Sequence, residues 1–263
     1  MKLSKAWPQF AETWIENWPD GLLSLSFPHI GIRLEEREVH ALVALNGIGD
    51  HCIDRRREED LYALEAKLDG AISHFPPGAF IRLGSRSPKD TVHGVITQCK
   101  AFDGRQAIRL LTSGSEIVAF DLRTARKASY QPWVFVRQWV DISPEMEFRC
   151  FMKNRHLIGV SQYFYQTSFP ALDSQEIRNT IKALLDEFFT DFSKVSPLDN
   201  VIFDVALFLD KKPQVMLVEI NPFHPLTQAC LFSWNTSDFD GGFRFTQSES
   251  KPESFMDFFP LFK

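Results

Sequence analysis

The stretch Val218–Phe223, VEINPF, places the carboxylate of Glu219 and the amide of Asn221 two residues apart at the end of an apolar run. Upstream, the stretch Val201–Asp210, VIFDVALFLD, carries another carboxylate, Asp204, inside a second apolar run. The two runs flank a Lys-Lys-Pro sequence, a pattern that predicts a β-hairpin. Because a hairpin joins antiparallel strands, this stretch decides the fold class.

Side chains alternate between the two faces of a strand, which predicts the residues that share a face. On this basis Glu219 and Asn221 share a face with Leu217 and Val215, and Asp204 lies across from Glu219. Two carboxylates that face each other on an apolar sheet repel. Either a positive charge offsets them or one carboxyl group holds a proton.

A hard divalent cation is one such positive charge. Magnesium prefers oxygen ligands and is usually held by one or two carboxylates together with substrate phosphates. Asp204, Glu219 and Asn221 supply ligands of this kind. The residues alone leave a second interpretation open, in which the same side chains face solvent or pair with lysine and arginine.

The rest of the chain predicts an α+β fold. Apolar spacing predicts a helix over residues 58–75, two helices separated by a Gly-Ser break within 104–125, and a capped helix over 173–192. Residues 37–46 fit a strand or a helix. Strands are expected within 79–90, before a polar turn, and over 133–142, with a further hairpin within 147–164. The C-terminal half is therefore a mostly antiparallel sheet with helices on one side.

Composition excludes several classes of protein. A chain of 263 residues with 44% hydrophobic residues buries a sizeable core, as one domain or two lobes. A net charge of -5 gives no reason to expect direct nucleic-acid binding. The chain shows no signal-peptide pattern and no apolar run long enough to span a bilayer, and its four cysteines lack zinc spacing, so we expect a cytoplasmic protein without a membrane partner.

Five phrases, in order and near the right spacing, resemble the cell division cycle protein 123 family. They are FIRLGSRSPKD, SGSEIVAFDL, VRQWVDISPEMEFRCFMKNRHLIGVSQY, VIFDVAL and VEINPFHPLTQACLFSW, and the similarity covers Phe75–Trp234. The resemblance implies an ATP-grasp-like fold, two lobes with mostly antiparallel sheets and a nucleotide cleft between them. It implies an N-terminal lobe over residues 1–135, with a phosphate-side strand near 79–90, and a C-terminal lobe over 136–263 that carries the magnesium site.

The resemblance also assigns site residues. Asp204, Glu219 and Asn221 match the magnesium ligands of the family, although the family usually has Asp where this chain has Glu219. Glu is the commoner residue there among ATP-grasp enzymes, so the implied metal site is retained. Arg149 matches an arginine that faces the phosphates, whereas Tyr163 stands where the family commonly has a further arginine.

The remaining matches lie between residue 82 and residue 140. Arg82 stands where the family has a lysine that reaches the phosphates, and the nearby Ser87 is either a phosphate contact or a turn residue. Trp139 and Val140 match the hinge at which adenine lies. The implied ligands are therefore ATP and Mg²⁺.

The resemblance leaves three functions open. The first is an ATP–magnesium-binding assembly factor, or chaperone, for a protein partner, which in eukaryotic relatives is the gamma subunit of translation initiation factor two. The second is an ATP-grasp enzyme, a carboxylate–amine ligase or a kinase, that activates an unknown substrate; Glu219 is the enzyme-like residue. The third is an interaction protein whose nucleotide site has decayed, as the departures at Arg82 and Tyr163 suggest.

Overall fold

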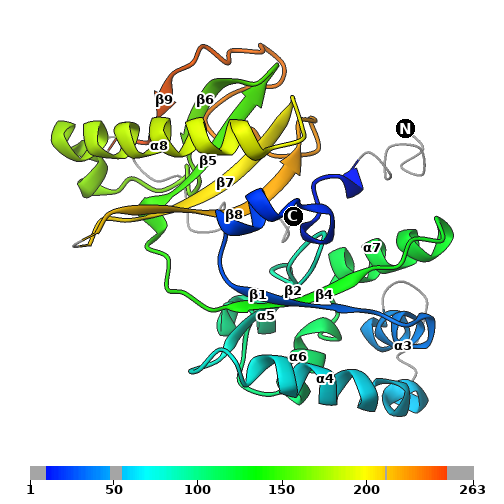
Figure 1. Ribbon diagram of the computed structural model, residues 1–263. Coiled ribbons are helices and arrows are strands. Elements are labelled where there is room, and N and C mark those ends of the chain that lie inside the picture. Colours follow the sequence, from blue (N-terminus) through cyan, green and yellow to red (C-terminus); the bar gives the residue numbers. More distant parts are fainter. Residues whose placement is uncertain (1–9, 48–54, 211, 248–263) are drawn as a thin grey trace. The chain divides into compact units, whose positions relative to one another are not determined.

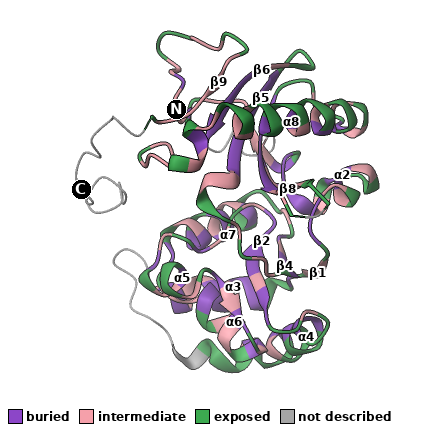
Figure 2. Ribbon diagram, turned by 90° about the vertical axis from the view of Figure 1, so that its left-hand side faces the viewer, coloured by how far each residue is buried: buried purple, intermediate pink, exposed green. Residues whose placement is uncertain are grey.

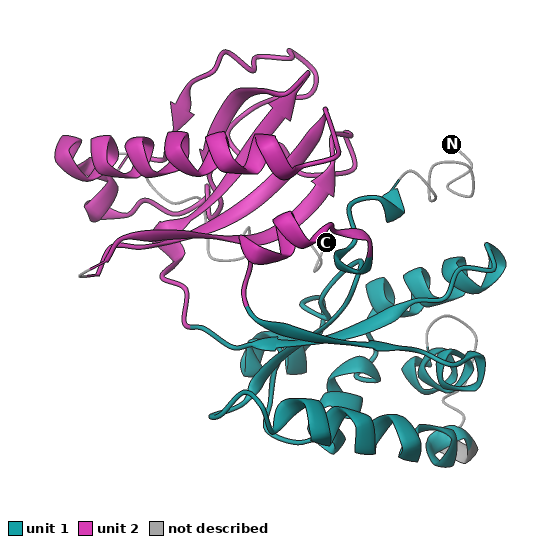
Figure 3. Ribbon diagram, viewed as in Figure 1, with its two compact units in different colours: residues 1–16, 28–140 teal, residues 17–27, 141–263 magenta. Residues whose placement is uncertain are grey.

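The computed structural model describes residues 10–47, 55–210 and 212–247. The chain divides into two compact units, Met1–Glu16 with Pro28–Val140, and Asn17–Phe27 with Asp141–Lys263 (Figure 3). The sequence prediction placed the division after residue 135. The two units instead part after residue 140, because the strand over residues 133–138 is hydrogen-bonded into the first sheet.

Unit 1 is built on a four-stranded antiparallel sheet with the order β1-β4-β2-β3 (Figure 1). Its strands are β1 (His29–Arg33), β2 (Ala79–Leu83), β3 (Lys100–Ala101) and β4 (Trp133–Gln138). Its helices are α3 (Glu36–Asn46), α4 (Tyr62–Ile72), α5 (Val92–Thr97), α6 (Gly104–Leu111) and α7 (Glu116–Lys127), with a 3-10 segment η2 (Arg55–Leu61) before α4. Apolar side chains of α3, α4, α6 and α7 form one core with the inner residues of the sheet.

Residues 37–46, for which a strand and a helix were both open, form helix α3. Glu35 and Glu38 make a reciprocal capping box at its start, so the first free backbone N–H groups have partners. Gly47 ends the helix with a left-handed φ of 57°, a conformation that glycine adopts without steric cost. The predicted helix over 58–75 corresponds to η2 and α4, and the two helices predicted within 104–125 are α6 and α7.

Unit 2 is built on a five-stranded sheet with the order β8-β7-β5-β6-β9. All its strand pairs are antiparallel except β6 with β9. The strands are β5 (Glu147–Lys153), β6 (His156–Gln162), β7 (Val201–Phe208), β8 (Gln214–Pro222) and β9 (Phe243–Arg244). The helical segments are η1 (Ile15–Asn17), which the division between the units cuts, α2 (Asp20–Ser24), η3 (Pro144–Met146), η4 (Pro170–Asp173) and α8 (Gln175–Val195).

Both predicted hairpins are present, as β5–β6 and β7–β8. The turn of the first consists of Asn154 and Arg155, with φ of 49° and 61°. Two consecutive positive φ values are the geometry of the tight turns that match strand twist in short hairpins. The predicted helix over 173–192 is α8, and the hydroxyl of Ser174 accepts a hydrogen bond from the backbone N–H of Ile177, as an N-cap does.

The two faces of the unit 2 sheet are covered by different segments. Helix α8 packs on one face, where the ring centroids of Phe192 and Phe203 lie 4.1 Å apart. The chain segment 223–239 covers the other face, where the ring of Phe232 lies 5.3 Å from that of Phe151. Figure 2 shows the consequence, with buried residues along the strands and exposed residues on the outer side of α8.

These two units confirm the predicted α+β class with mostly antiparallel sheets. Within the part of the chain that the structure describes, no helix combines the length and the apolar character that crossing a bilayer requires.

Candidate functional site

Three charged residues stand in a row across the unit 2 sheet. Arg149 of β5 pairs with Asp204 of β7, and Asp204 pairs in turn with Glu219 of β8. The predicted cross-strand pairing of Asp204 with Glu219 is confirmed. Arg149 shares its sheet face with Phe151, two positions along the strand, so the row lies on the face that the 223–239 segment covers.

A β-bulge in the second hairpin changes one prediction. The register passes from the pair Asp204–Glu219 to the pair Val205–Leu217, which leaves Val218 as an extra residue. Leu217 therefore lies on the opposite face from Glu219 and is fully buried. Val215, which pairs with Leu207, lies on that opposite face as well. The predicted placement of Leu217 and Val215 on the face of Glu219 is wrong, because strict alternation does not continue through a bulge.

Arg149 and Asp204 form a buried, forked ion pair. Nε of Arg149 donates to Oδ1 of Asp204 and Nη2 donates to Oδ2, each at 2.8 Å. The side chains are 8% and 1% exposed. The third guanidinium nitrogen, Nη1, donates to the carbonyl oxygen of Gln228 in the covering segment at 2.9 Å. Arg149 therefore supplies the positive charge that offsets the Asp204 carboxylate in this structure.

A tyrosine ring and two cysteine thiols lie near the pair. The ring of Tyr163 lies 5.0 Å from the guanidinium carbon of Arg149, within cation–π range. Burial alone lowers the pKa of Arg149, but the adjacent Asp204 carboxylate outweighs burial and leaves that pKa well above its usual range. Burial raises the pKa of the Cys230 thiol to about 12 and also raises that of Cys150, so both thiols stay neutral.

The three predicted metal ligands lie together on neighbouring strands. Nδ2 of Asn221 lies 3.4 Å from Oδ2 of Asp204, within reach of a weak hydrogen bond, and Glu219 and Asn221 are both half-buried. The described residues contain no group of three His, Cys, Asp or Glu side chains that would hold a metal ion. Two carboxylates and one amide are nevertheless a donor set that fits magnesium, whose remaining ligands are commonly waters and phosphates.

Arg82 and Ser87 belong to unit 1. Arg82 lies on β2 and is 3% exposed. Its Nε donates to the carbonyl oxygen of Leu83 at 2.9 Å and its Nη2 to that of Ser85 at 3.2 Å, so part of its hydrogen-bonding capacity holds the loop after β2. Ser87 lies in that loop and is half-buried.

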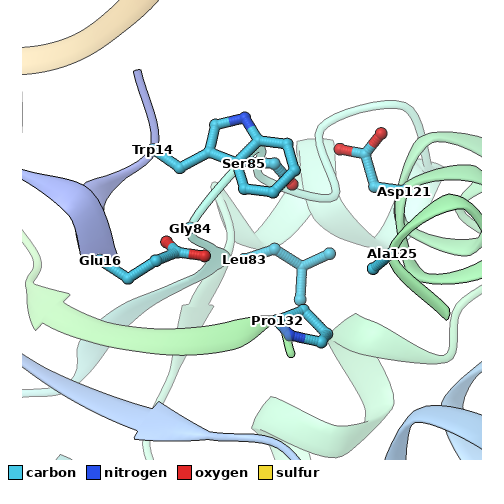
Figure 4. A pocket seen from close by; sticks show the side chains of 8 residues that line it. All are labelled: Trp14, Glu16, Leu83, Gly84, Ser85, Asp121, Ala125 and Pro132. Atoms are coloured by element: carbon cyan, nitrogen blue, oxygen red, sulfur yellow. The ribbon is translucent and has the colours of Figure 1, made fainter. Parts of the chain in front are cut away.

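A cavity of about 10 Å³ lies beside this loop, room for about one water molecule (Figure 4). Glu16 and Asp121 line it, and neither Oε2 of Glu16 nor Oδ2 of Asp121 accepts a hydrogen bond from any described residue, although Nε of Arg86 lies 3.5 Å from the latter. The carboxylate of Glu16 also packs on Gly84, where a Cβ would collide with it. Sequence reasoning did not single out these two carboxylates.

Burial shifts both carboxyl groups toward the protonated form. Burial raises the pKa of Glu16, against the Tyr130 hydroxyl and the charge of Arg82, which lower it. Burial also raises the pKa of Asp121, against Arg86 and Ser85. A carboxyl whose pKa is higher in the folded state stabilises that state below its ordinary pKa, and this contribution is lost as the pH rises through the folded pKa.

Trp139 and Val140 follow β4 at the end of unit 1, and both are half-buried. Nζ of Lys100 lies 3.9 Å from the centroid of the Trp139 ring and 5.3 Å from that of Phe102. Lys100 is on β3 and pairs with Phe80 of β2. Sequence reasoning missed Lys100, whose only signal is a single cation within the otherwise apolar or uncharged stretch QCKAF.

The candidate residues thus form two groups, one on each unit. Unit 2 brings together four of them, Arg149, Asp204, Glu219 and Asn221. Unit 1 carries the other four on β2, the loop after it and the end of β4: Arg82, Ser87, Trp139 and Val140.

Curated relatives of the chain share one name. A protein from Dictyostelium discoideum is 29% identical over 185 residues, which cover 68% of this chain and 47% of the relative. A protein from Xenopus tropicalis is 26% identical over 223 residues, which cover 73% and 63%. Each is named translation initiation factor eIF2 assembly protein. The chain therefore spans less than two thirds of the length of these relatives.

Solved structures of Cdc123 from Schizosaccharomyces pombe have the same fold. One structure of Cdc123 matches with a TM-score of 0.68 and 22% identity, over 87% of this chain and 90% of that one. A C-terminally truncated form matches with a TM-score of 0.71 and 20% identity, over 89% and 93%. The family model described as D123 matches residues 48–257. Because that match spans most of the sequence, the chain belongs to the D123 family.

Proposed function

We propose that this protein binds ATP with Mg²⁺ and acts as an assembly factor for a protein partner. The observation that carries the proposal is the row of Arg149, Asp204 and Glu219, with Asn221 beside it, on adjacent strands of a D123 family chain. A basic side chain for phosphate and an oxygen donor set for a hard cation lie within one sheet face.

The proposed roles follow from the chemistry of each side chain. Asp204, Glu219 and Asn221 hold the metal, and Arg149 contacts the phosphates. When bound, the metal neutralises charge on the triphosphate oxygens. In unit 1, Arg82 and Ser87 contact the phosphates, and Trp139 and Val140 contact adenine.

The proposed partner is a component of a translation initiation factor. The support is that the relatives are named eIF2 assembly proteins and that the family resemblance points to the gamma subunit of initiation factor two. In this role ATP stabilises the binding-competent protein, and the product is a protein complex. We propose the cytoplasm as the site of action, which agrees with the free thiols of Cys99, Cys150 and Cys230.

A second candidate function is ATP-dependent catalysis, as in a carboxylate–amine ligase or a kinase. Glu219 favours it, because this chain places a glutamate directly across from Asp204, where ATP-grasp enzymes commonly have one. An enzyme releases ADP or AMP from ATP in a manner that depends on an acceptor. An assembly factor instead retains one stoichiometric partner without turnover, so the two functions are separable.

The first experiment is calorimetric titration of ATP, with and without Mg²⁺, into the wild-type protein and into Glu219→Ala. We expect magnesium-dependent binding by the wild type that Glu219→Ala weakens strongly. The matched control is Glu187→Ala, which removes an exposed carboxylate from α8 of the same unit and leaves binding unchanged. Absence of ATP binding by the folded wild-type protein, with and without Mg²⁺, contradicts the proposal.

A further inference from the structure

Arg149 connects the two proposed ligand sets of unit 2. It is the proposed phosphate ligand, and its guanidinium is hydrogen-bonded to both oxygens of Asp204, the proposed metal ligand. We propose that Arg149 and Asp204 exchange partners when nucleotide and cation bind; this inference rests on the proposed function. Arg149 turns to the phosphates as Asp204 turns to the cation, so each ligand binds weakly alone and the two bind strongly together.

The geometry of the pair supports this exchange. All three guanidinium nitrogens already donate, two to Asp204 and one to the carbonyl oxygen of Gln228. Asp204 accepts from both fork nitrogens and is approached by Nδ2 of Asn221. An incoming cation therefore meets a carboxylate whose negative charge is already offset, and incoming phosphates meet a guanidinium that is already engaged.

Burial makes binding of the cation alone, or of the phosphates alone, unfavourable. Asp204 is 1% exposed and Arg149 8%, so water does not replace a lost partner. A cation that binds alone leaves Arg149 beside extra positive charge, and phosphates that bind alone leave Asp204 beside extra negative charge. An uncompensated buried charge is strongly destabilising, whereas loading both ligands gives each residue a new partner of opposite charge.

The exchange is a coupling between two ligands, and coupling is reciprocal. Nucleotide raises the affinity of the protein for the cation by the same factor as the cation raises the affinity for nucleotide. Couplings of this kind are typically about 5- to 150-fold. Removing the positive charge of Arg149 makes Asp204 available to a cation before nucleotide arrives.

The test measures Mn²⁺ binding to the nucleotide-free protein by electron paramagnetic resonance, with Mn²⁺ as the probe for the magnesium site. The pH is 8, which favours the ionised form of a carboxyl that has lost its partner. We expect Arg149→Met to bind Mn²⁺ about tenfold more tightly than the wild type does. Arg149→Lys, which replaces a forked contact with a single-point one, gives a smaller increase.

Two further variants serve as controls. Arg155→Met breaks an exposed arginine–aspartate pair in the same unit, with Asp199 at 2.9 Å, and leaves Mn²⁺ binding unchanged. The double variant Arg149→Met/Asp204→Asn removes both buried charges and shows no gain in Mn²⁺ affinity. If Arg149→Met does not fold, Arg149→Lys and the double variant carry the comparison.

Titration of ATP with Mn²⁺ into the wild type distinguishes failure of the partner exchange from failure of the proposed function. A wild type that binds Mn²⁺ with ATP, together with folded Arg149 variants that bind Mn²⁺ alone no more tightly than the wild type, overturns the exchange and leaves the proposed function standing. A folded wild type that does not bind ATP with Mn²⁺ overturns the proposed function, and the exchange with it.

Discussion

The buried Arg149–Asp204 pair gives a quantitative prediction for stability. The perturbation is a double-mutant cycle with Arg149→Met, Asp204→Asn and the double variant. Each single variant leaves one member of a fork whose two hydrogen bonds are 2.8 Å long and whose side chains are 8% and 1% exposed. The double variant leaves neither charge behind.

The magnitudes follow from this burial. Breaking a buried ion pair on one side costs about 3–5 kcal/mol of unfolding free energy, since the remaining charge is desolvated and has lost its counter-charge. The double variant avoids that cost, so we expect it to be more stable than the sum of the single effects implies, with a coupling energy of about 3 kcal/mol. The exposed pair Arg155–Asp199, at 42% and 63% exposure, serves as the control and has an expected coupling below about 1 kcal/mol.

The assay is urea unfolding followed by circular dichroism, with the dependence of the unfolding free energy on urea compared among the variants. An unchanged slope shows that the unfolding transition itself is the same in each variant. A coupling energy for Arg149 and Asp204 as small as that of the exposed control pair would contradict this prediction. It would mean that solvent or another partner replaces the lost charge.

Three other predictions follow from the structure. Glu16→Gln should flatten the dependence of the unfolding free energy on pH above pH 4.5, since the wild-type protein loses the protonated form of that buried carboxyl as the pH rises. Urea unfolding at several pH values measures this dependence, and parallel pH profiles of the unfolding free energy for wild type and variant would contradict the prediction. Phe203→Ala should cost about 3–5 kcal/mol, because the fully buried ring stacks on Phe192 at 4.1 Å; thermal and urea unfolding test this, with a loss below 1 kcal/mol as the contrary result. Lys100→Met should weaken ATP binding about two- to fivefold, because it removes the cation–π contact that holds Trp139, the proposed adenine residue; calorimetry that shows equal affinity would assign Lys100 a packing role only.

Several features of the fold were predictable from local sequence. The apolar runs and turn residues predicted both hairpins of unit 2, and helical spacing with the Ser174 cap predicted α8. Period-two alternation with a short turn also predicted that Asp204 and Glu219 are cross-strand partners. These predictions hold because they depend on residues close together in the chain, where periodicity and turn chemistry limit the conformations available.

Other features required the tertiary structure. The bulge at Val218 moves Leu217 to the opposite face, and no residue type near Val218 predicts this change of register. The inclusion of Asn17–Phe27 in unit 2 depends on contacts such as that of Ser26 with Leu217, far along the chain. The contact of Lys100 on β3 with Trp139, the residue after β4, likewise joins positions that helices α6 and α7 separate along the chain.

Local sequence was enough to show which residues of unit 2 carry charge and oxygen donors, and that a hairpin holds two of them opposite each other. That Arg149, from a different hairpin, lies against Asp204 and offsets its charge became known from the assembled sheet. Strand order in a sheet is set by the packing of whole elements, which local periodicity does not encode. The partner of a buried charge is therefore known only once the sheet is assembled.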